Sequence, residues 1–463
     1  MALRSQTPSS PVAIGGSTSD RRWSVGTLTY TSAGLCALFA WLLWGDFAWQ
    51  LKERAATPVA QLMLRQFGSS DLLVSILVGS VPAALGMILG PIVSVRSDRH
   101  RGRWGRRIPY LLVPTPFIVI GMAGLAWTPA LGAWMHQLWG AGSPGADVCR
   151  LIAFTFFWGL FEIFTVIANA VFGGLINDVV PPALIGRFFG LFRAVSLLAG
   201  IIFNFWLIGH AEEHFTAIFL VLAFVYGAGF AIMCLRVKEG DYPPPPPPAL
   251  KTNRIAPVKA YLRECYSKPF YLWVFVALML GNLAGGPVNS FSVFYAKSIG
   301  MDMTTYGKLL VATYVSSFAL SFFLGWLADK FHPIRVGLVA MGLYAAVMLW
   351  GGIAATDTAR FGVAFIAHGV LTGTFFTGTA SLGQRLFPAT KFAQFASAAG
   401  ILGALGYVVL PPATGLWLDL TGHVYRHTFT ASGLLALLAL GAFAKVYQSY
   451  RALGGDAGYR AQE

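Results

Sequence analysis

The chain has 463 residues, of which 56% are hydrophobic and only 11% are charged, and its mean hydropathy is +0.64. Soluble domains carry about 25% charged residues, so this composition excludes an ordinary soluble protein. The formal net charge of +14 does not indicate nucleic-acid binding, because the basic residues fall in short segments between long apolar stretches and no soluble basic domain remains.

Long apolar stretches recur along the whole sequence, each able to cross the roughly 30 Å of hydrocarbon in a bilayer. They are too long and too uniformly apolar for barrel strands, so an all-α membrane protein is predicted. A polar cytoplasmic tail over 1–27 comes first, and we expect the span after it to act as an uncleaved signal anchor. Twelve spans are expected, at 28–55, 71–95, 108–128, 149–173, 188–209, 215–236, 269–296, 305–328, 334–355, 361–384, 393–417 and 428–448.

The first expected span carries one polar stripe, because Asp46, Gln50 and Glu53 follow at i, i+4 and i+7 on one helix face. This pattern favours a cavity wall in which Asp46 is a protonatable group and Gln50 contacts substrate. The alternative is that the helix ends early and these charges lie in water at the outer leaflet. Pro58, which disfavours helix at the residue before it, is compatible with both interpretations.

Two short charged loops match each other in the two halves of the chain. The first follows the second span and runs Ser97-Asp98-Arg99-His100-Arg101-Gly102-Arg103-Trp104-Gly105-Arg106-Arg107. The second, Gly325-Trp326-Leu327-Ala328-Asp329-Lys330, follows the eighth span, and its aspartate lies 231 residues after the first. We expect opposed charges to form a cytoplasmic gate latch here, from Asp98, Arg99, Arg106, Arg107, Asp329 and Lys330. Topology alone explains most of the arginines, but not the matched aspartates.

A second correspondence supports an internal repeat. Pro181 and Arg187 follow the fourth span, and Pro388 and Gln394 follow the tenth span at the same six-residue separation. Repeats after the second and eighth spans and after the fourth and tenth spans predict a six-plus-six architecture, in which two bundles rock about a site near the membrane midplane.

Glu162 lies in the middle of the fourth span, within Phe156-Phe157-Trp158-Gly159-Leu160-Phe161-Glu162. A charge at the bilayer centre costs about 3 kcal/mol or more unless it faces a cavity or a partner. We interpret Glu162 as a proton-coupling and substrate-bonding group, with Asn169 on its helix face at i+7. A structural ion pair or a buried neutral acid is the alternative.

Arg193 lies early in the fifth span, on a face that continues through Ser196, Gly200 and Asn204. We expect it to pair with Glu162 and to contact substrate. It is equally compatible with an arginine whose stem lies in the membrane while its head reaches the cytoplasmic headgroups.

The longest polar stretch between spans, 237–268, is expected to be a cytoplasmic linker between an N-terminal bundle at 28–236 and a C-terminal bundle at 269–448, with a cytoplasmic tail at 449–463. Its prolines, Pro243 to Pro248, predict a stiff polyproline II spacer. A docking site for a proline-reading domain is the alternative.

The seventh span is interrupted by glycine and proline between Asn282 and Asn289. Broken spans with polar side chains are a pointer to a binding site, and amides suit sugar hydroxyls because they both donate and accept. Substrate contact is therefore expected at both asparagines, with helix packing as the alternative. His368, in the tenth span, is a further candidate for proton or hydrogen-bond chemistry, or else a satisfied bundle histidine.

The charged loops resemble those of the major facilitator superfamily. The first loop, continued through Ile108-Pro109, is similar to the signature of the glycoside–pentoside–hexuronide:cation symporters and the sucrose:proton symporters. Gly45-Asp46-Phe47-Ala48-Trp49-Gln50-Leu51 resembles the first span of the sucrose branch. The resemblance implies a twelve-helix facilitator fold and cation-coupled sugar transport.

Within that branch, an acid on the fourth span precedes an aspartate by 16 positions, as Glu162 precedes Asp178 here. The branch also carries an arginine where this chain has Gly173, a departure that bears on sucrose as substrate. No acid occurs between Asp71 and Asp98, which disfavours a sodium site of the melibiose type.

No nucleotide-binding loop, catalytic triad or metal-ligand spacing occurs, and Cys36, Cys149, Cys234 and Cys265 are scattered. We therefore expect no enzyme, cofactor or metal. The predicted function is a proton-coupled sugar or glycoside symporter, monomeric and multi-pass in the plasma membrane or a bacterial inner membrane, with both termini cytoplasmic. Its partners are a small-molecule substrate, a proton and membrane lipid. An exporter or facilitator of another solute, and a non-transporting assembly factor of the same superfamily, are the alternatives.

Overall fold

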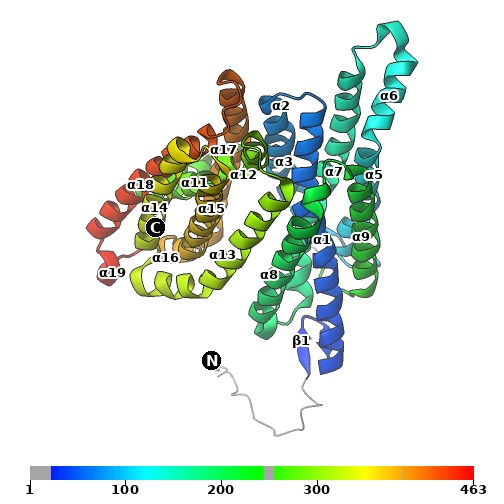
Figure 1. Cartoon of the computed structure of the whole chain (residues 1–463). Coiled ribbons are helices and arrows are strands. Elements are labelled where there is room, and N and C mark those ends of the chain that lie inside the picture. Colours follow the sequence, from blue (N-terminus) through cyan, green and yellow to red (C-terminus); the bar gives the residue numbers. More distant parts are fainter. Residues whose placement is uncertain (1–21, 245–254, 389–390, 463) are drawn as a thin grey trace, which may run out of the picture.

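The computed structural model describes residues 22–244, 255–388 and 391–462, and most of these residues are helical (Figure 1). Most of the expected N-terminal tail and Pro245 to Pro248 of the linker lie outside the described residues. An antiparallel strand pair precedes the first helix, β1 (Trp23–Val25) with β2 (Leu28–Tyr30). The first span therefore begins at Ser32 instead of 28, where the Thr31 hydroxyl caps the helix by accepting from the Gly34 N–H at 3.2 Å.

Within residues 22–244, the N-terminal half contains nine α-helices and the short π- and 3₁₀-helical turns between them. They are α1 (Ser32–Gln66), α2 (Asp71–Ser75), π-helix η1 (Ile76–Ser80), α3 (Val81–Arg99), α4 (Ile108–Leu112), α5 (Pro114–Ala126), α6 (Thr128–Trp139), η2 (Gly140–Gly142), α7 (Ala146–Val179), η3 (Pro182–Leu184), α8 (Ile185–Ile202), π-helix η4 (Phe203–Leu207), η5 (Ile208–His210) and α9 (Phe215–Arg236).

Helix α10 (Ile255–Tyr266) precedes the second half. The helices of the second half are α11 (Pro269–Leu283), α12 (Gly286–Ser298), α13 (Met303–Phe331), α14 (Pro333–Ala354), α15 (Thr358–Thr379), α16 (Leu382–Leu386), α17 (Phe392–Leu420), α18 (His427–Ala452) and α19 (Gly455–Gly458). The expected break in the seventh span is confirmed at Ala284 and Gly285, between α11 and α12.

Eleven helical stretches of the described residues are long and apolar enough to cross a membrane. They match eleven of the twelve expected spans, with longer bounds for several, such as 32–66 for the first. The remaining expected span, 305–328, coincides with α13, a 29-residue helix whose side chains are described only in part. The all-α, twelve-span membrane fold is thereby confirmed.

Helix α1 does not end where the sequence suggested. It runs through Pro58 to Gln66, because one missing N–H costs a 35-residue helix little when buried residues such as Val59 and Leu64 continue its packed face. Two helices were not expected. Pro129, near the start of α6, begins a new helix one residue after α5 ends, and α10 forms in the C-terminal part of the linker.

The helices form two groups. Within the first, α1 packs on α8 and α9, and α7 packs on α3 and α5; within the second, α14 packs on α15 and α18, and α11 packs on α17 and α18. The groups meet along two seams, where α17 lies on α2, η1 and α3, and where α13 lies on η4, η5 and α8 (Figure 1). Each seam includes a π-helical turn, η1 or η4, which widens the helix where the halves touch.

The two groups touch at one end and separate toward the other. Figure 1 shows α2, α12 and α17 side by side, whereas the helices spread apart toward β1 and α19. We name the touching end the Asp71 end and the spread end the Asp98 end, after residues at the two ends of the second span. The Asp98 end carries the arginine-rich loop.

Candidate functional site

The polar stripe on α1 lies inside the protein. Asp46 is fully buried and accepts a 3.1 Å hydrogen bond from Gln50 Nε2, while its second carboxylate oxygen has no protein partner. Gln50 Oε1 in turn accepts from Ser196 Oγ at 3.0 Å, which ties the stripe to α8. The alternative of a helix that ends early in outer-leaflet water is therefore wrong, because α1 continues to Gln66 and Asp46 is fully buried, although Glu53 is exposed.

Lys52 is the group that the sequence analysis missed. It is completely buried, with its ammonium 4.0 Å from the centre of the Trp49 ring and 5.0 Å from that of Phe161. Its Nζ lies 2.5 Å from Glu53 Oε1 and donates to Thr165 Oγ1 at 3.3 Å. A basic residue inside an apolar span is itself the sequence signal that could have identified it.

Glu162 faces this ion pair from α7. Its side chain is 7% exposed, and Glu53 and Lys52 are the charged groups whose fields act on it. It lies in the wall of a cavity of about 730 Å³. The cavity is lined by α1, α3 and α7 and carries a dense set of polar groups: Gln50, Glu53, Arg54, Glu162, Thr165 and Asn169.

The expected pairing of Arg193 with Glu162 does not occur in this conformation. Arg193 is exposed on α8, and no ion pair joins it to Glu162 in the described part of the chain. Arg54 of α1, and not Arg193, lies between the two halves. Its guanidinium donates to Ser196 Oγ at 3.3 Å and to the Tyr314 hydroxyl of α13 at 3.4 Å, so it bridges the two halves.

The second half contributes uncharged polar groups. The His368 ring is buried, and its nitrogens lie 2.7 Å from the Tyr344 hydroxyl and 3.0 Å from Asn289 Oδ1. Asn289 is exposed and also borders a smaller cavity of about 210 Å³. Asn282 lies before the break in the span, and its backbone carbonyl accepts from the Tyr407 hydroxyl. Asn289 is thus exposed, while the His368 ring contacts its Oδ1 from the buried side.

The arginine-rich loop forms an ion-pair network within the N-terminal half. Arg106 makes a two-pronged contact to Asp178 at the end of α7, at 2.6 and 3.0 Å, and Asp178 raises the pKa of Arg106. Arg107 joins Asp98 at 2.6 Å to Asp178 at 3.1 Å, and its Nη1 donates to Ser97 Oγ at 3.2 Å. Asp98, Arg106 and Arg107 are therefore brought together, with Asp178 as a member that the gate prediction did not include.

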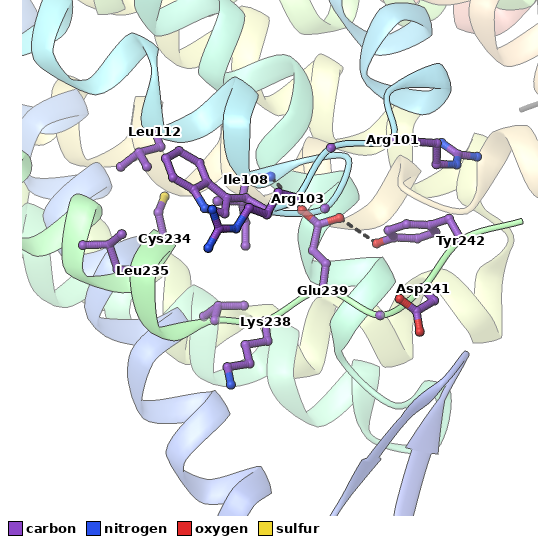
Figure 2. Close-up of a pocket in the computed structure, with 15 residues that line it drawn as sticks. Arg101, Arg103, Ile108, Leu112, Cys234, Leu235, Lys238, Glu239, Asp241 and Tyr242 are labelled. Carbon is purple, nitrogen blue, oxygen red and sulfur yellow. Dashed lines mark hydrogen bonds between the residues drawn. The ribbon is translucent and has the colours of Figure 1, made fainter. Parts of the chain in front are cut away.

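The start of the linker completes this network (Figure 2). Both carboxylate oxygens of Glu239 accept backbone N–H groups, those of Arg106, Arg107 and Ile108, at 2.7 to 3.0 Å. Tyr242 donates to Glu239 at 2.8 Å and lies under the Arg106 guanidinium at 4.1 Å. Burial, and then the Glu239 carboxylate, raise the pKa of the Tyr242 hydroxyl, so it remains a donor.

The other expected latch residues lie apart from this network. Arg99 ends α3, and Lys330 is exposed at the end of α13 with its ammonium over Trp326 at 4.9 Å. The side chain of Asp329 lies outside the described residues. The loop bonds of Asp98, Arg106 and Arg107 stay within their own half and the linker, so a latch between the halves remains a prediction for another conformation.

The Asp71 end carries a cross-half network that the sequence analysis did not identify. The buried Asp71 carboxylate accepts from the Tyr425 hydroxyl at 3.0 Å and lies 2.6 Å from His423 Nδ1. Asp419 reciprocates by accepting the N–H groups of Asp71 and Leu72 at 2.9 Å, which caps α2. The possible ligand atoms of Asp71, Asp419 and His423 lie within 4.8 Å of one another, a spacing that a metal site could have. Each carboxylate oxygen of the two aspartates, however, already lies within hydrogen-bond distance of a protein group.

Two further contacts close the same end. Glu212, after η5, pairs with Lys297 of α12. Gly307 of α13 lies so close to η4 that a Cβ there would meet the Asn204 carbonyl oxygen at 1.9 Å. Only glycine allows the halves to approach to this degree.

In the described part of the chain, eleven apolar helical stretches and α13 form two groups, and Glu162 is buried in the wall of a polar cavity; this arrangement defines a membrane protein of the transporter type. A family model described as MFS/sugar transport protein matches residues 64–392, most of the chain. The chain belongs to this family. The resemblance drawn from the charged loops is confirmed at that level.

Solved structures of about the same length share the fold. A bacterial homologue of the human lysosomal transporter Spinster, inward-facing and unoccupied, superimposes with a TM-score of 0.64 at 14% identity, covering 90% of this chain and 97% of that chain. A D-xylose–proton symporter gives 0.63 at 14% identity, covering 89% and 96%. The human membrane-associated transporter protein is 37% identical over 78 residues, 17% of this chain, and the match spans only 14% of that relative.

Proposed function

We propose that this protein is a secondary active transporter that moves a sugar or glycoside together with a proton by alternating access. The observation that carries the proposal is Glu162, a buried carboxyl in the wall of a polar cavity of about 730 Å³, facing the Lys52–Glu53 ion pair. A charged group is retained at such depth when it serves a substrate or ion pathway. Membership of a family described as MFS/sugar transport protein supports the substrate class.

The charges of this cluster explain how a proton is coupled to movement. Lys52 and Glu53 form an ion pair at 2.5 Å, and Arg54 and Glu162 are the other charged groups in and around the cavity wall. Protonation of Glu162 removes one negative charge from this wall. We take the resulting change in charge balance as the coupling step. Asp46, buried with one unpartnered oxygen, is the second proposed proton site.

The sugar is proposed to lie between the halves. Gln50 and Asn169 offer donors and acceptors from the cavity wall, and Asn289 offers the same from the second half, held by His368. Arg193 and Asn282 complete the proposed substrate set in a conformation where the halves are closer at the Asp98 end.

We place both termini and the arginine-rich loop in the cytoplasm of a plasma membrane, by the positive-inside rule, with a monomer as the functional unit. The open Asp98 end is then the cytoplasmic entrance, and the boundaries 28–236 and 269–448 define the two moving bundles. The polar cavity lining weighs against a non-transporting assembly factor, for which an apolar interior would suffice.

The test is proton uptake in proteoliposomes that contain a trapped pH dye, over a panel of mono- and disaccharides. We expect a sugar-dependent proton influx that is lost in Glu162→Gln and kept in Glu213→Gln, a matched loss of an exposed acid at the Asp71 end. Sugar counterflow, which moves no net proton, should survive in Glu162→Gln and so show that the variant folds and binds. Proton influx that persists in Glu162→Gln would remove Glu162 from coupling, and silence across the panel would reject a sugar substrate.

A further inference from the structure

A second cavity, of about 560 Å³, lies at the Asp98 end and shares no lining residue with the polar cavity. It is formed by the connector 101–105, by Ile108 and Leu112 of α4, and by the end of α9 with the residues that follow, 234–235 and 237–242 (Figure 2). The cavity therefore lies where two membrane spans, Ile108–Ala126 and Phe215–Arg236, reach the membrane surface.

One side of this cavity is apolar and exposed. Leu235 is 66% exposed and Trp104 is 55% exposed, and both line the cavity beside Leu112. Exposed leucine at the last turn of a span faces acyl chains, and tryptophan is enriched at the headgroup level. The apolar side fits the glycerol and upper acyl region of a lipid.

The same side carries cations without acidic partners. Arg103 and Lys238 are exposed, and across the described residues no carboxylate pairs with either side chain. Figure 2 shows Arg103 on the side of Cys234 and Leu235, Lys238 at the lower centre, and Asp241 on the opposite side. Arg101 also lines the cavity. It donates to the backbone carbonyls of Asp98, His100 and Pro243 and lies over the Tyr242 ring at 5.6 Å, and no carboxylate pairs with it among the described residues.

The two acids of the cavity offset only part of this charge, since three basic residues line it and no ion pair joins the two sets among the described residues. Glu239 is already satisfied by three backbone N–H groups and the Tyr242 hydroxyl. Asp241 points away from the apolar side in Figure 2. An uncompensated basic group above exposed apolar surface, at the end of membrane spans, is the chemistry that binds an anionic phospholipid.

We propose that this cavity binds one anionic phospholipid, with its phosphate on Arg103 and Lys238 and its acyl chains along Leu112 and Leu235. Lys238 is the neighbour of Glu239 in the chain, so the bound lipid holds the start of the linker onto the arginine-rich loop. The lipid therefore stabilises the network of Arg106, Asp178 and Tyr242. This proposal does not depend on the solute that is transported or on which leaflet the Asp98 end faces.

The experiment measures thermal unfolding of the purified full chain in detergent as lipid is added. The probes are phosphatidylglycerol, phosphatidylcholine and sn-glycerol 3-phosphate, each titrated on the wild type and on Arg103→Gln/Lys238→Gln. We expect phosphatidylglycerol to raise the Tm of the wild type. The double variant should need about 25-fold more of it, from about 1 kcal/mol per basic residue at 1.4 kcal/mol per tenfold.

A matched control removes two other exposed arginines at the same end, Arg187→Gln/Arg451→Gln, and should respond like the wild type. Should the double variant fail to fold, Arg103→Gln and Lys238→Gln are titrated singly, with about a fivefold loss expected for each. An unchanged response in the variants, or an equal response to phosphatidylcholine, would overturn the proposal. A full Tm shift with glycerol 3-phosphate alone would also overturn it, in favour of a soluble-anion site.

Discussion

Lys52 shows how one residue can organise a membrane-buried site. Its ammonium is buried and contacts the faces of Trp49 and Phe161, the Thr165 hydroxyl and the Glu53 carboxylate in place of bulk water. Cation–π contacts are worth about 2 kcal/mol or more when desolvated, so the aromatic walls offset part of the cost of burial. Glu53 and Lys52 are also the charged groups whose fields act on Glu162, so Lys52 contributes to the surroundings of the proposed proton site.

Lys52→Met should lower stability more than the loss of packing alone. It leaves the Glu53 carboxylate without its cation, and breaking a pair that is buried on one side costs about 2 kcal/mol after allowance for the exposure of Glu53. The measurement is the free energy of unfolding in detergent for Lys52→Met, Glu53→Gln and the double variant. We expect the double variant to be more stable than Lys52→Met, because it leaves no unpaired charge. Strictly additive losses would show that the pair is not coupled.

At the scale of elements, the seam between α13 and η4 depends on a single glycine. Gly307→Val places side-chain atoms where the Asn204 carbonyl now lies, at 1.9 Å from the first added carbon, so α13 must move away from η4. We expect the Asp71 end to open, measured as at least a fivefold faster reaction of Ser290→Cys with a membrane-impermeant maleimide added on that side. Gly403→Val is the control, since no atom lies within 4 Å of a Cβ there. Equal rates in both variants would contradict a closed seam.

The junction of α10 with α17 predicts a pH dependence. Hydrogen bonds from Lys391 and Gln394 lower the pKa of Glu264 below its usual 4.5. A carboxyl with a lowered folded-state pKa stabilises the junction above pH 4.5, and this stabilisation is lost as the pH falls through the lowered value. The mobility of a spin label at Lys259 should therefore be low at pH 7 and rise modestly below pH 4.5, because Tyr261 and Tyr266 continue to hold α10 to α17.

Glu264→Gln tests that assignment, because it removes the charge without shortening the side chain. The label on α10 should already be partly mobile at pH 7 in this variant and should change little on acidification. A variant that keeps the wild-type pH response would assign the transition to another group.

At the scale of the whole molecule, the sequence predicted what local patterns encode. Apolar lengths gave the twelve spans, Gly285 and Pro287 located the break in the seventh, and the depth of Glu162 predicted its burial. The pairings could not be predicted in the same way. His423 and Asp71 meet across 352 residues, and Glu239 reaches the arginine-rich loop from the linker, contacts that leave no periodic signal in the sequence.

For the same reason, the sequence does not predict which of two arginines, Arg193 or Arg54, bridges the two halves. Arg193 and Arg54 both lie on helix faces that point toward the centre, and sequence spacing favours neither. The packing of α1 against α8 and α13 determines which of the two arginines bridges the halves, since Arg54, and not Arg193, hydrogen-bonds both Ser196 and Tyr314. Tertiary contact, and not local periodicity, therefore determines which arginine bridges the two halves in this conformation.

The central claim is alternating access: when the two halves close at one end of the molecule, they open at the other end. Its most direct test is the distance between paired spin labels, in a background without the four native cysteines. One pair joins Arg187 of α8 to Phe331 of α13 at the Asp98 end, and the other joins Gln66 of α1 to Leu420 of α17 at the Asp71 end. A third pair, Arg187 with Arg236, lies within one half and is the control.

We expect acidic pH together with a transported solute to shorten the distance at the Asp98 end and to lengthen the distance at the Asp71 end, while the control distance stays constant. Distances that remain fixed at both ends, or that change in the same direction, would contradict alternating access between the two bundles.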